Sequence, residues 1–118
     1  MLDKRKFYIN GKWVAPSKPN DLDVIDPCTE DSVATISLGS KEDTNAAVSA
    51  AKTAFESWKE SSKEERVALL EKLLTIYKKR YSEMVDAISL EMGAPADWSK
   101  DVQTASGQSH IEDFILRL

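Results

Sequence analysis

The sequence predicts a mixed α+β segment in which two N-terminal β-hairpins precede three helices. An Asn-Gly pair between short apolar runs and a later stretch of period-two alternation indicate the hairpins. From residue 40 onward, apolar residues recur at helical spacing. With 118 residues, the chain has room for one small domain at most. We therefore expect strands in residues 1–39 and helices in residues 40–118.

The first hairpin is predicted from Phe7–Ile9 and Lys12–Val14, which flank Asn10-Gly11. Asn and Gly both accept positive φ, as the two central positions of a type I′ turn require. Residues 15–20 follow with two prolines, which cannot donate ladder hydrogen bonds, so this stretch is predicted to be a loop.

The second hairpin is predicted from Leu22–Ile25 and Val33–Leu38, on either side of a turn at residues 26–31. The second of these runs alternates apolar and polar residues, which is typical of a half-buried strand. We expect the two hairpins to form one small antiparallel layer, which needs a packing partner to be stable.

The first helix is expected to begin after Ser40, which forms a capping box with Asp43, and to end at Ser61-Ser62. One stripe of this helix is apolar and rich in small residues: Ala47, Ala50, Ala51, Ala54, Phe55 and Trp58.

A second capping box at Ser62 opens a long amphipathic pattern that Gly93 and Pro95 stop. If continuous from Lys63 to Met92, this helix is about 45 Å long. A compact globule of this chain length has a radius of gyration of only ~13–14 Å. We therefore expect the helix to lie along the flank of a larger body.

A third helical pattern runs from Pro95 to Leu118, and Gly107 is expected to weaken its middle by about 1 kcal/mol relative to Ala. The apolar pattern reaches Leu118 without a polar tail or capping residue, so we expect it to continue in a longer chain. The stripe around Phe114, Ile115 and Leu118 is a candidate partner surface.

Composition excludes several classes of function. Sixteen Lys and Arg against twenty Asp and Glu give a net charge of −4, which argues against a nucleic-acid partner. No apolar run approaches the ~20 residues of a membrane span, and no secretory signal is present. A single cysteine favours a cytoplasmic protein. The four glycines are isolated, so the chain has no dinucleotide-binding or P-loop motif.

Few residues could carry chemistry. Cys28 lies among acidic residues in a turn and is interpreted as structural, and His110 has no neighbours at metal-ligand spacing. A Cys28–His110 dyad stays open at this point. Tyr77 and Tyr81 share an apolar stripe and are interpreted as core residues. We predict no catalytic and no cofactor-binding residue in this chain.

The order of these pieces resembles the N-terminal segment of the aldehyde dehydrogenase superfamily. The resemblance extends from about Phe7 to about Phe114. Glu30 departs from the family pattern, because glycine is common at its position and takes positive φ more freely. The matching pieces are Phe7–Val14 ("INGKWV"), Val24–Glu30 (similar to "VINPATGE"), the Ala-rich helix from Ser40 to Trp58, and the helix from Glu65 that ends in Glu91-Met92-Gly93-Ala94-Pro95.

The resemblance implies an incomplete N-terminal portion, residues 1–118, of the α/β Rossmann-like NAD(P)-binding domain of a longer enzyme. Such enzymes oxidise an aldehyde to a carboxylic acid with NAD or NADP, using a cysteine nucleophile, a water-activating glutamate and an oxyanion-stabilising asparagine. All three lie beyond the matched region in the family, so the chain alone is expected to be inert and to bind no cofactor. Its partners would be the rest of the dehydrogenase chain and, for the parent enzyme, further copies. The alternative is a non-catalytic helical interaction or oligomerisation module.

The resemblance also implies a structural monovalent cation. Its ligands would be the backbone carbonyls of Val24 and Ile25 and the carboxylate of Glu91. Hard oxygen ligands suit such a cation. The alternative is that Glu91 is simply solvated at a capped helix end.

Overall fold

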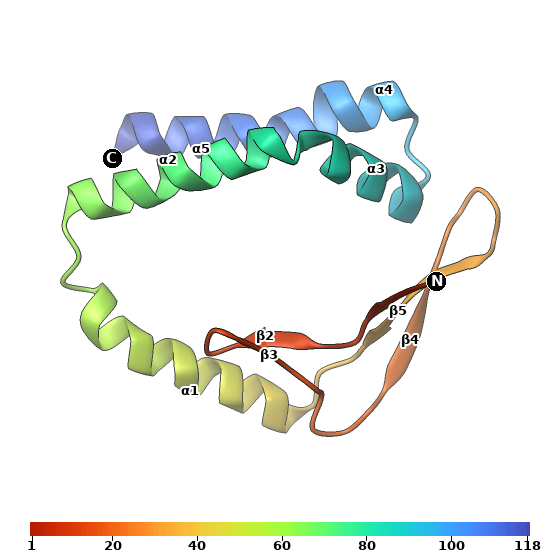
Figure 1. The fold of residues 1–118 in the computed structure, drawn as a ribbon, viewed down its shortest axis with the longest axis horizontal. Helices are drawn as coiled ribbons and strands as arrows, with labels where there is room; N and C mark the ends of the chain where they lie inside the picture. The colour runs from red at the N-terminus through yellow and green to blue at the C-terminus, as the bar shows by residue number, and fades with distance from the viewer. The chain divides into compact units, whose positions relative to one another are not determined.

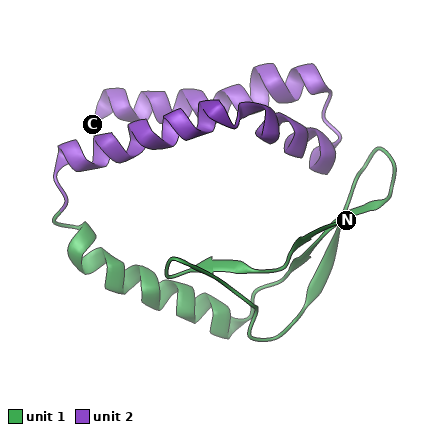
Figure 2. Cartoon of the chain, viewed as in Figure 1, with its two compact units in different colours: residues 1–60 green, residues 61–118 purple.

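The computed structural model describes every residue from Met1 to Leu118. The chain divides into two compact units, shown in Figure 2. Unit 1, Met1–Glu60, contains the strands and the first helix, and unit 2, Ser61–Leu118, contains the remaining helices. The predicted α+β order of strands followed by helices is confirmed. None of the helices combines the length and apolarity that a membrane crossing requires.

Both predicted hairpins are present in unit 1 (Figure 1). The first pairs β2 (Phe7–Ile9) with β3 (Lys12–Val14) in antiparallel register. Its turn residues Asn10 and Gly11 have φ of 52° and 74°, so both take the positive values that a type I′ turn needs. The second hairpin pairs β4 (Asp21–Ile25) with β5 (Ser32–Ser37).

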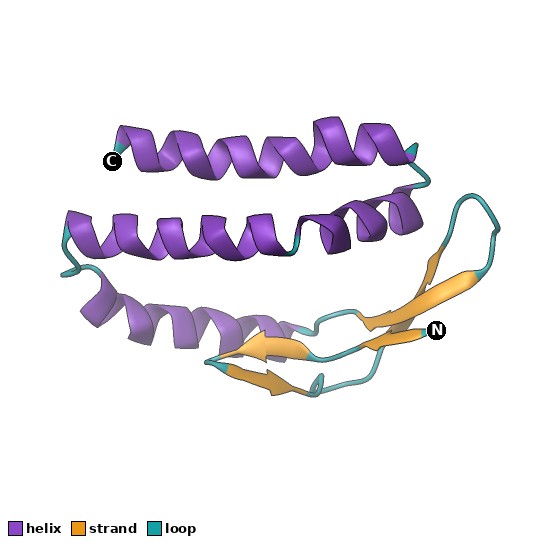
Figure 3. Ribbon diagram, turned by 45° about the horizontal axis from the view of Figure 1, so that its top comes forward, coloured by secondary structure: helices purple, strands orange, loops and turns teal.

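The expectation of one antiparallel layer is wrong. The two hairpins belong to separate sheets, and a further strand, β1 (Leu2–Lys4), pairs with β5 in parallel register to give the order β1-β5-β4. Figure 3 shows these short strands in orange. Because β1 is three residues long and has no period-two pattern, only its non-local pairing identifies it as a strand.

Helix α1 (Lys41–Trp58) begins as predicted. The Ser40 hydroxyl accepts the Asp43 N–H, and the Asp43 carboxylate accepts the Ser40 N–H at 2.9 Å, which completes the capping box. Asp43 also accepts the Ser17 N–H at 2.9 Å. One buried carboxylate therefore caps α1 and fastens the proline-containing loop to it.

The amphipathic pattern from Lys63 to Met92 does not form one continuous helix, because the helix breaks at Arg80. Helix α2 covers Lys63–Lys79 and α3 covers Tyr81–Met92. Arg80 has φ −104° and ψ 20°, and its N–H is shared between the carbonyls of Ile76 and Tyr77. The predicted ends are confirmed: Ser62 forms a capping box with Glu65, and Gly93 ends α3 at φ 65°.

The predicted third helix starts after Pro95 but is not uniform. A short α4 (Ala96–Trp98) leads into η1 (Ser99–Thr104), a π-helical segment, and then into α5 (Ala105–Arg117). Segments of this kind are rare and lack a simple sequence signature.

In unit 2 the chain returns on itself, so that α5 lies antiparallel to α2 and η1 lies beside α3. The Tyr77 hydroxyl donates to the Thr104 carbonyl at 2.9 Å, and the Tyr81 hydroxyl donates to the Lys100 carbonyl at 2.5 Å. The two rings meet edge to face with centroids 6.3 Å apart. These contacts confirm that the tyrosines are packing residues.

Candidate functional site

The residues predicted to hold a cation are distributed between the two units. Val24 and Ile25 are neighbours in β4 of unit 1, and Glu91 is exposed in the last turn of α3 in unit 2. The β4–β5 ladder is interrupted between Val24 and Ile25, where Val33 is the extra residue of a β-bulge. The cation site stays a prediction.

Side chains alone offer no metal centre. No group of three or more His, Cys, Asp or Glu side chains is arranged to hold a metal ion. That finding does not bear on the predicted site, because two of its three ligands are backbone carbonyls.

Cys28 is an exposed free thiol in the turn between β4 and β5. Its backbone N–H donates to Asp26 Oδ1 at 2.8 Å, so the residue has a local structural role. His110 is exposed on α5, in the other unit. The structure assigns neither side chain a partner that would make it a nucleophile or a base.

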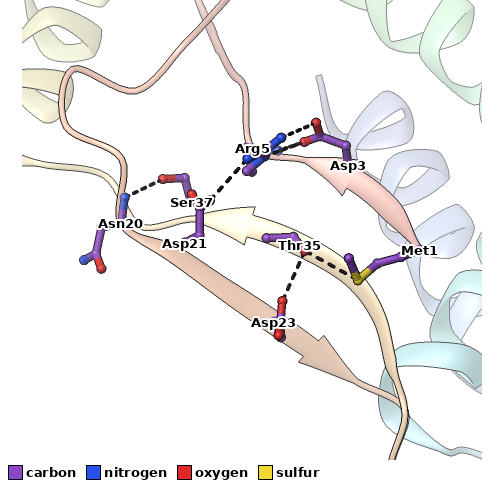
Figure 4. Close-up of polar contacts among 8 residues, drawn as sticks. All are labelled: Met1, Asp3, Arg5, Asn20, Asp21, Asp23, Thr35 and Ser37. Atoms are coloured by element: carbon purple, nitrogen blue, oxygen red, sulfur yellow. Dashed lines mark hydrogen bonds and ion pairs between the residues drawn. The ribbon is translucent and has the colours of Figure 1, made fainter.

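A polar cluster that the sequence did not predict lies on the three-stranded sheet (Figure 4). The Arg5 guanidinium donates to both carboxylate oxygens of Asp3, at 3.0 and 2.8 Å, and to Asp21 Oδ2 at 3.3 Å. Hydrogen bonds from Arg5 lower the pKa of Asp3 to about 2, and the same contacts raise the pKa of Arg5. Thr35, in the central strand, donates to Asp23 at 3.1 Å. The Arg5–Asp21 bond links the residue after β1 to β4, and the Thr35–Asp23 bond links the neighbouring strands β5 and β4.

A second group of polar residues lies in unit 2, where η1 meets α2 and α3. Ser99 is fully buried, and its hydroxyl accepts from Ser89 at 3.0 Å. Thr104 is also fully buried, and its hydroxyl has no hydrogen-bond partner. Burial, together with the neighbouring Tyr81, raises the pKa of Tyr77, which stays a neutral hydrogen-bond donor. This cluster positions helices and contains no acid–base pair.

The predicted partner surface on α5 is partly occupied within unit 2. Ile115 is half-buried, whereas Phe114 is 64% exposed and Leu118 is 44% exposed. Of that stripe, only Phe114 and Leu118 are therefore substantially accessible.

Comparison with known proteins identifies the family. A model described as the aldehyde dehydrogenase family matches residues 13–115. The chain belongs to the aldehyde dehydrogenase family. The resemblance noted from the motifs is thereby confirmed.

Two named dehydrogenases show how much of such a protein this chain represents. It is 40% identical over 112 residues to a 3-succinoylsemialdehyde-pyridine dehydrogenase of Pseudomonas, covering 94% of this chain and 24% of that protein. It matches a crystal structure of an aldehyde dehydrogenase from Bartonella henselae with 57% identity and a TM-score of 0.96, covering 98% of this chain and 24% of that one. The chain thus spans about a quarter of the aldehyde dehydrogenases that it matches.

A third relative was solved with cofactor and aldehyde bound. Aldehyde dehydrogenase C from Pseudomonas syringae, as a C291A mutant in complex with NAD⁺ and octanal, is 37% identical with a TM-score of 0.90. The match covers 92% of this chain and 22% of that one.

Proposed function

We propose that this chain is the N-terminal segment of an NAD(P)-dependent aldehyde dehydrogenase, which converts an aldehyde, NAD(P)⁺ and water to a carboxylic acid and NAD(P)H. It would form an incomplete portion of the cofactor-binding domain. The observation that carries the proposal is the Bartonella match, in which 98% of this chain corresponds to 24% of a dehydrogenase at a TM-score of 0.96.

The catalytic and cofactor-binding residues would be supplied by the part of the enzyme that lies outside the segment corresponding to this chain. The four isolated glycines form no dinucleotide-binding or P-loop motif, and Cys28 is an exposed thiol in the acidic turn between β4 and β5. The chain's own contribution is therefore structural: a capped set of helices and a small sheet that flank the cofactor-binding body.

A chimera tests this proposal. Residues 1–118 would replace the corresponding quarter of the Bartonella dehydrogenase, and aldehyde-dependent reduction of NAD⁺ and NADP⁺ would be followed by absorbance. The chimera should turn over, and the 118-residue chain alone should not. Turnover by the isolated chain, or a folded chimera without activity, would overturn the proposal.

We further propose that Val24, Ile25 and Glu91 bind a monovalent cation in the complete enzyme. The interrupted ladder at Val24 and the oxygen-only ligand set support it. In the chimera, K⁺ or Na⁺ should raise the melting temperature relative to a bulky organic cation, and Glu91→Gln should abolish that increase. Asp86→Asn, at an exposed position of the same helix, is the matched control. An unchanged cation response in Glu91→Gln would exclude this site.

The parent enzyme is proposed to be a cytoplasmic homo-oligomer with no nucleic-acid or membrane partner. The second candidate function is a helical interaction module, which the exposure of Phe114 (64%) and Leu116 (84%) favours. Sedimentation of the isolated chain separates the two: a stable, concentration-dependent oligomer that Phe114→Ser disrupts would favour the module.

A further inference from the structure

Helix α2 carries an apolar stripe that nothing in unit 2 covers. Leu69, Leu73 and Ile76 recur at helical spacing and are 53%, 47% and 45% exposed. A second apolar stripe, Leu70, Leu74 and Tyr77, is half-buried toward α5. Because each residue of an α-helix advances about 100° around the axis, the two stripes lie about 100° apart. Two adjacent sides of α2 are therefore apolar, and α5 covers only one of them.

The ion pair between α2 and α5 shows which side of the helix pair is polar. Lys78 Nζ lies 2.8 Å from Glu112 Oε1, and Gln108 donates to the same carboxylate oxygen at 3.0 Å. In two antiparallel helices, the positions of Lys78 and Glu112 lie on one side of the seam. The same geometry places Leu69, Leu73, Ile76 and Phe114 on the opposite side.

We call these four residues, Leu69, Leu73, Ile76 and Phe114, the α2–α5 apolar face. Charged groups border the face along α2. Glu65 caps the N-terminus of that helix, and beyond its C-terminus Arg80 pairs with Glu83 at 2.8 Å. A helix pair that is polar on one side and apolar on the other is typical of an outer layer packed on a further element.

We propose that the α2–α5 apolar face is the surface on which the remainder of an aldehyde dehydrogenase chain packs against this segment. The proposal rests on the proposed function and names the partner-binding surface for it. In the Bartonella enzyme, a segment of matching backbone is 24% of the chain, so about three quarters of that chain lies outside the matched segment. A second copy would cover the face only in an oligomer, whereas the rest of the polypeptide is present in every molecule of such an enzyme.

The test places a charge on the face and, as a control, on the solvent side of the same helix. Leu73→Glu puts a carboxylate at the centre of the face. Ala68→Glu puts the same group at an exposed position on the other side of α2. Both variants would be made in the isolated chain and in the Bartonella chimera, with Leu73→Ser as a milder change should the charged chimera fail to fold.

In the isolated chain, both Glu variants should keep the wild-type urea midpoint, because neither position faces α5. A midpoint lowered by Leu73→Glu alone would identify unit 1 as the occupant of the face and overturn the docking proposal. In the chimera, Leu73→Glu should lower the melting temperature by roughly 5–10 °C or abolish soluble expression. Leu73→Ser should give a smaller decrease, and Ala68→Glu should shift the melting temperature by less than about 2 °C.

The possible results separate the two proposals. An active chimera in which Leu73→Glu and Ala68→Glu are equally stable overturns the docking face and leaves the proposed function standing. An inactive wild-type chimera overturns the proposed function itself. An isolated chain that sediments as a dimer and becomes monomeric in Leu73→Glu would identify a second copy as the occupant and overturn the docking proposal.

Discussion

Gly107 lies against the phenol ring of Tyr77. A Cβ at Gly107 would lie 2.4 Å from the Tyr77 hydroxyl oxygen and 3.0 Å from Cζ. The same hydroxyl donates to the Thr104 carbonyl, at the end of the π-helical segment. The close approach of α2 and α5 therefore depends on the missing side chain at position 107.

Replacing Gly107 with Ala should lower the free energy of unfolding by about 1–3 kcal/mol, the usual cost of inserting a methyl group into a filled space. Helix propensity alone predicts the opposite, a gain of about 1 kcal/mol. Urea unfolding followed by helical ellipticity measures the sign directly.

The Tyr77→Phe variant provides the control, because it removes the atom nearest to the added methyl group. Gly107→Ala should lower the free energy of unfolding less in the Tyr77→Phe background than in the wild type. The double-mutant cycle would then give a non-zero coupling energy between positions 77 and 107. Equal costs in both backgrounds would show that the ring is not the obstacle.

Glu30 has φ 64° in the turn between β4 and β5, a left-handed conformation that glycine takes more freely than other residues. A left-handed conformation costs an L-residue about 1–2 kcal/mol, whereas glycine pays an entropic cost of roughly 0.5–1 kcal/mol. Glu30→Gly should therefore stabilise unit 1 by about 0.5–1 kcal/mol, measured as a higher urea midpoint. Asp31→Gly is the control, because the neighbouring Asp31 does not have a positive φ, and this substitution should be destabilising. If both glycine substitutions stabilised the protein, the gain would not come from the positive φ of Glu30.

Local signals in the sequence predicted the turns and helix ends correctly. Asn10-Gly11, the capping serines at 40 and 62, and Gly93 each fix the backbone within a few residues, and the structure shows each in its predicted role. Such local interactions can be predicted from the sequence without knowing which distant elements pack nearby.

Features that depend on partners distant in the sequence have no local signal. The break at Arg80 has no proline or glycine, and it lies between Tyr77 and Tyr81, whose hydroxyls bond to carbonyls of the π-helical segment. Helix propensity predicts that Gly107 weakens its helix, whereas in the structure the ring of Tyr77 fills the space that a side chain at this position would need. Strand β1 exists through its pairing with β5.

The candidate cation site shows the same limit. Every residue has a backbone carbonyl, so the type of side chain does not indicate which carbonyls bind a cation. Val24 and Ile25 are therefore proposed as ligands only from the family resemblance. Glu91 lies 66 residues further along the chain than Ile25, in the other unit. No spacing rule connects ligands that are so distant.

Asp43 should make the stability of unit 1 dependent on pH in acid. Hydrogen bonds from the backbone of Ser40 and Ser17 lower its pKa below the ordinary 3.8. Because the folded-state pKa is the lower one, its stabilisation is complete above pH 3.8 and is lost as the pH falls through the folded value. Asp43→Asn should lower the urea midpoint at neutral pH, and the difference from wild type should shrink in acid. A difference that stays constant from neutral pH to well below pH 3.8 would contradict this role.

Arg5 should control the titration of Asp3. Its guanidinium holds the pKa of Asp3 at about 2, mainly through side-chain hydrogen bonds, with a smaller contribution from Lys6. Arg5→Met should raise that pKa toward 3.8, which carboxyl NMR would report as a shifted titration curve. Lys6→Met removes a nearby charge without a hydrogen bond and should change the pKa far less. Because the pair is exposed, added salt should weaken its charge attraction while the two directed hydrogen bonds persist. An Asp3 that titrates at its ordinary value in the wild type would show that the Arg5 contact does not form in solution.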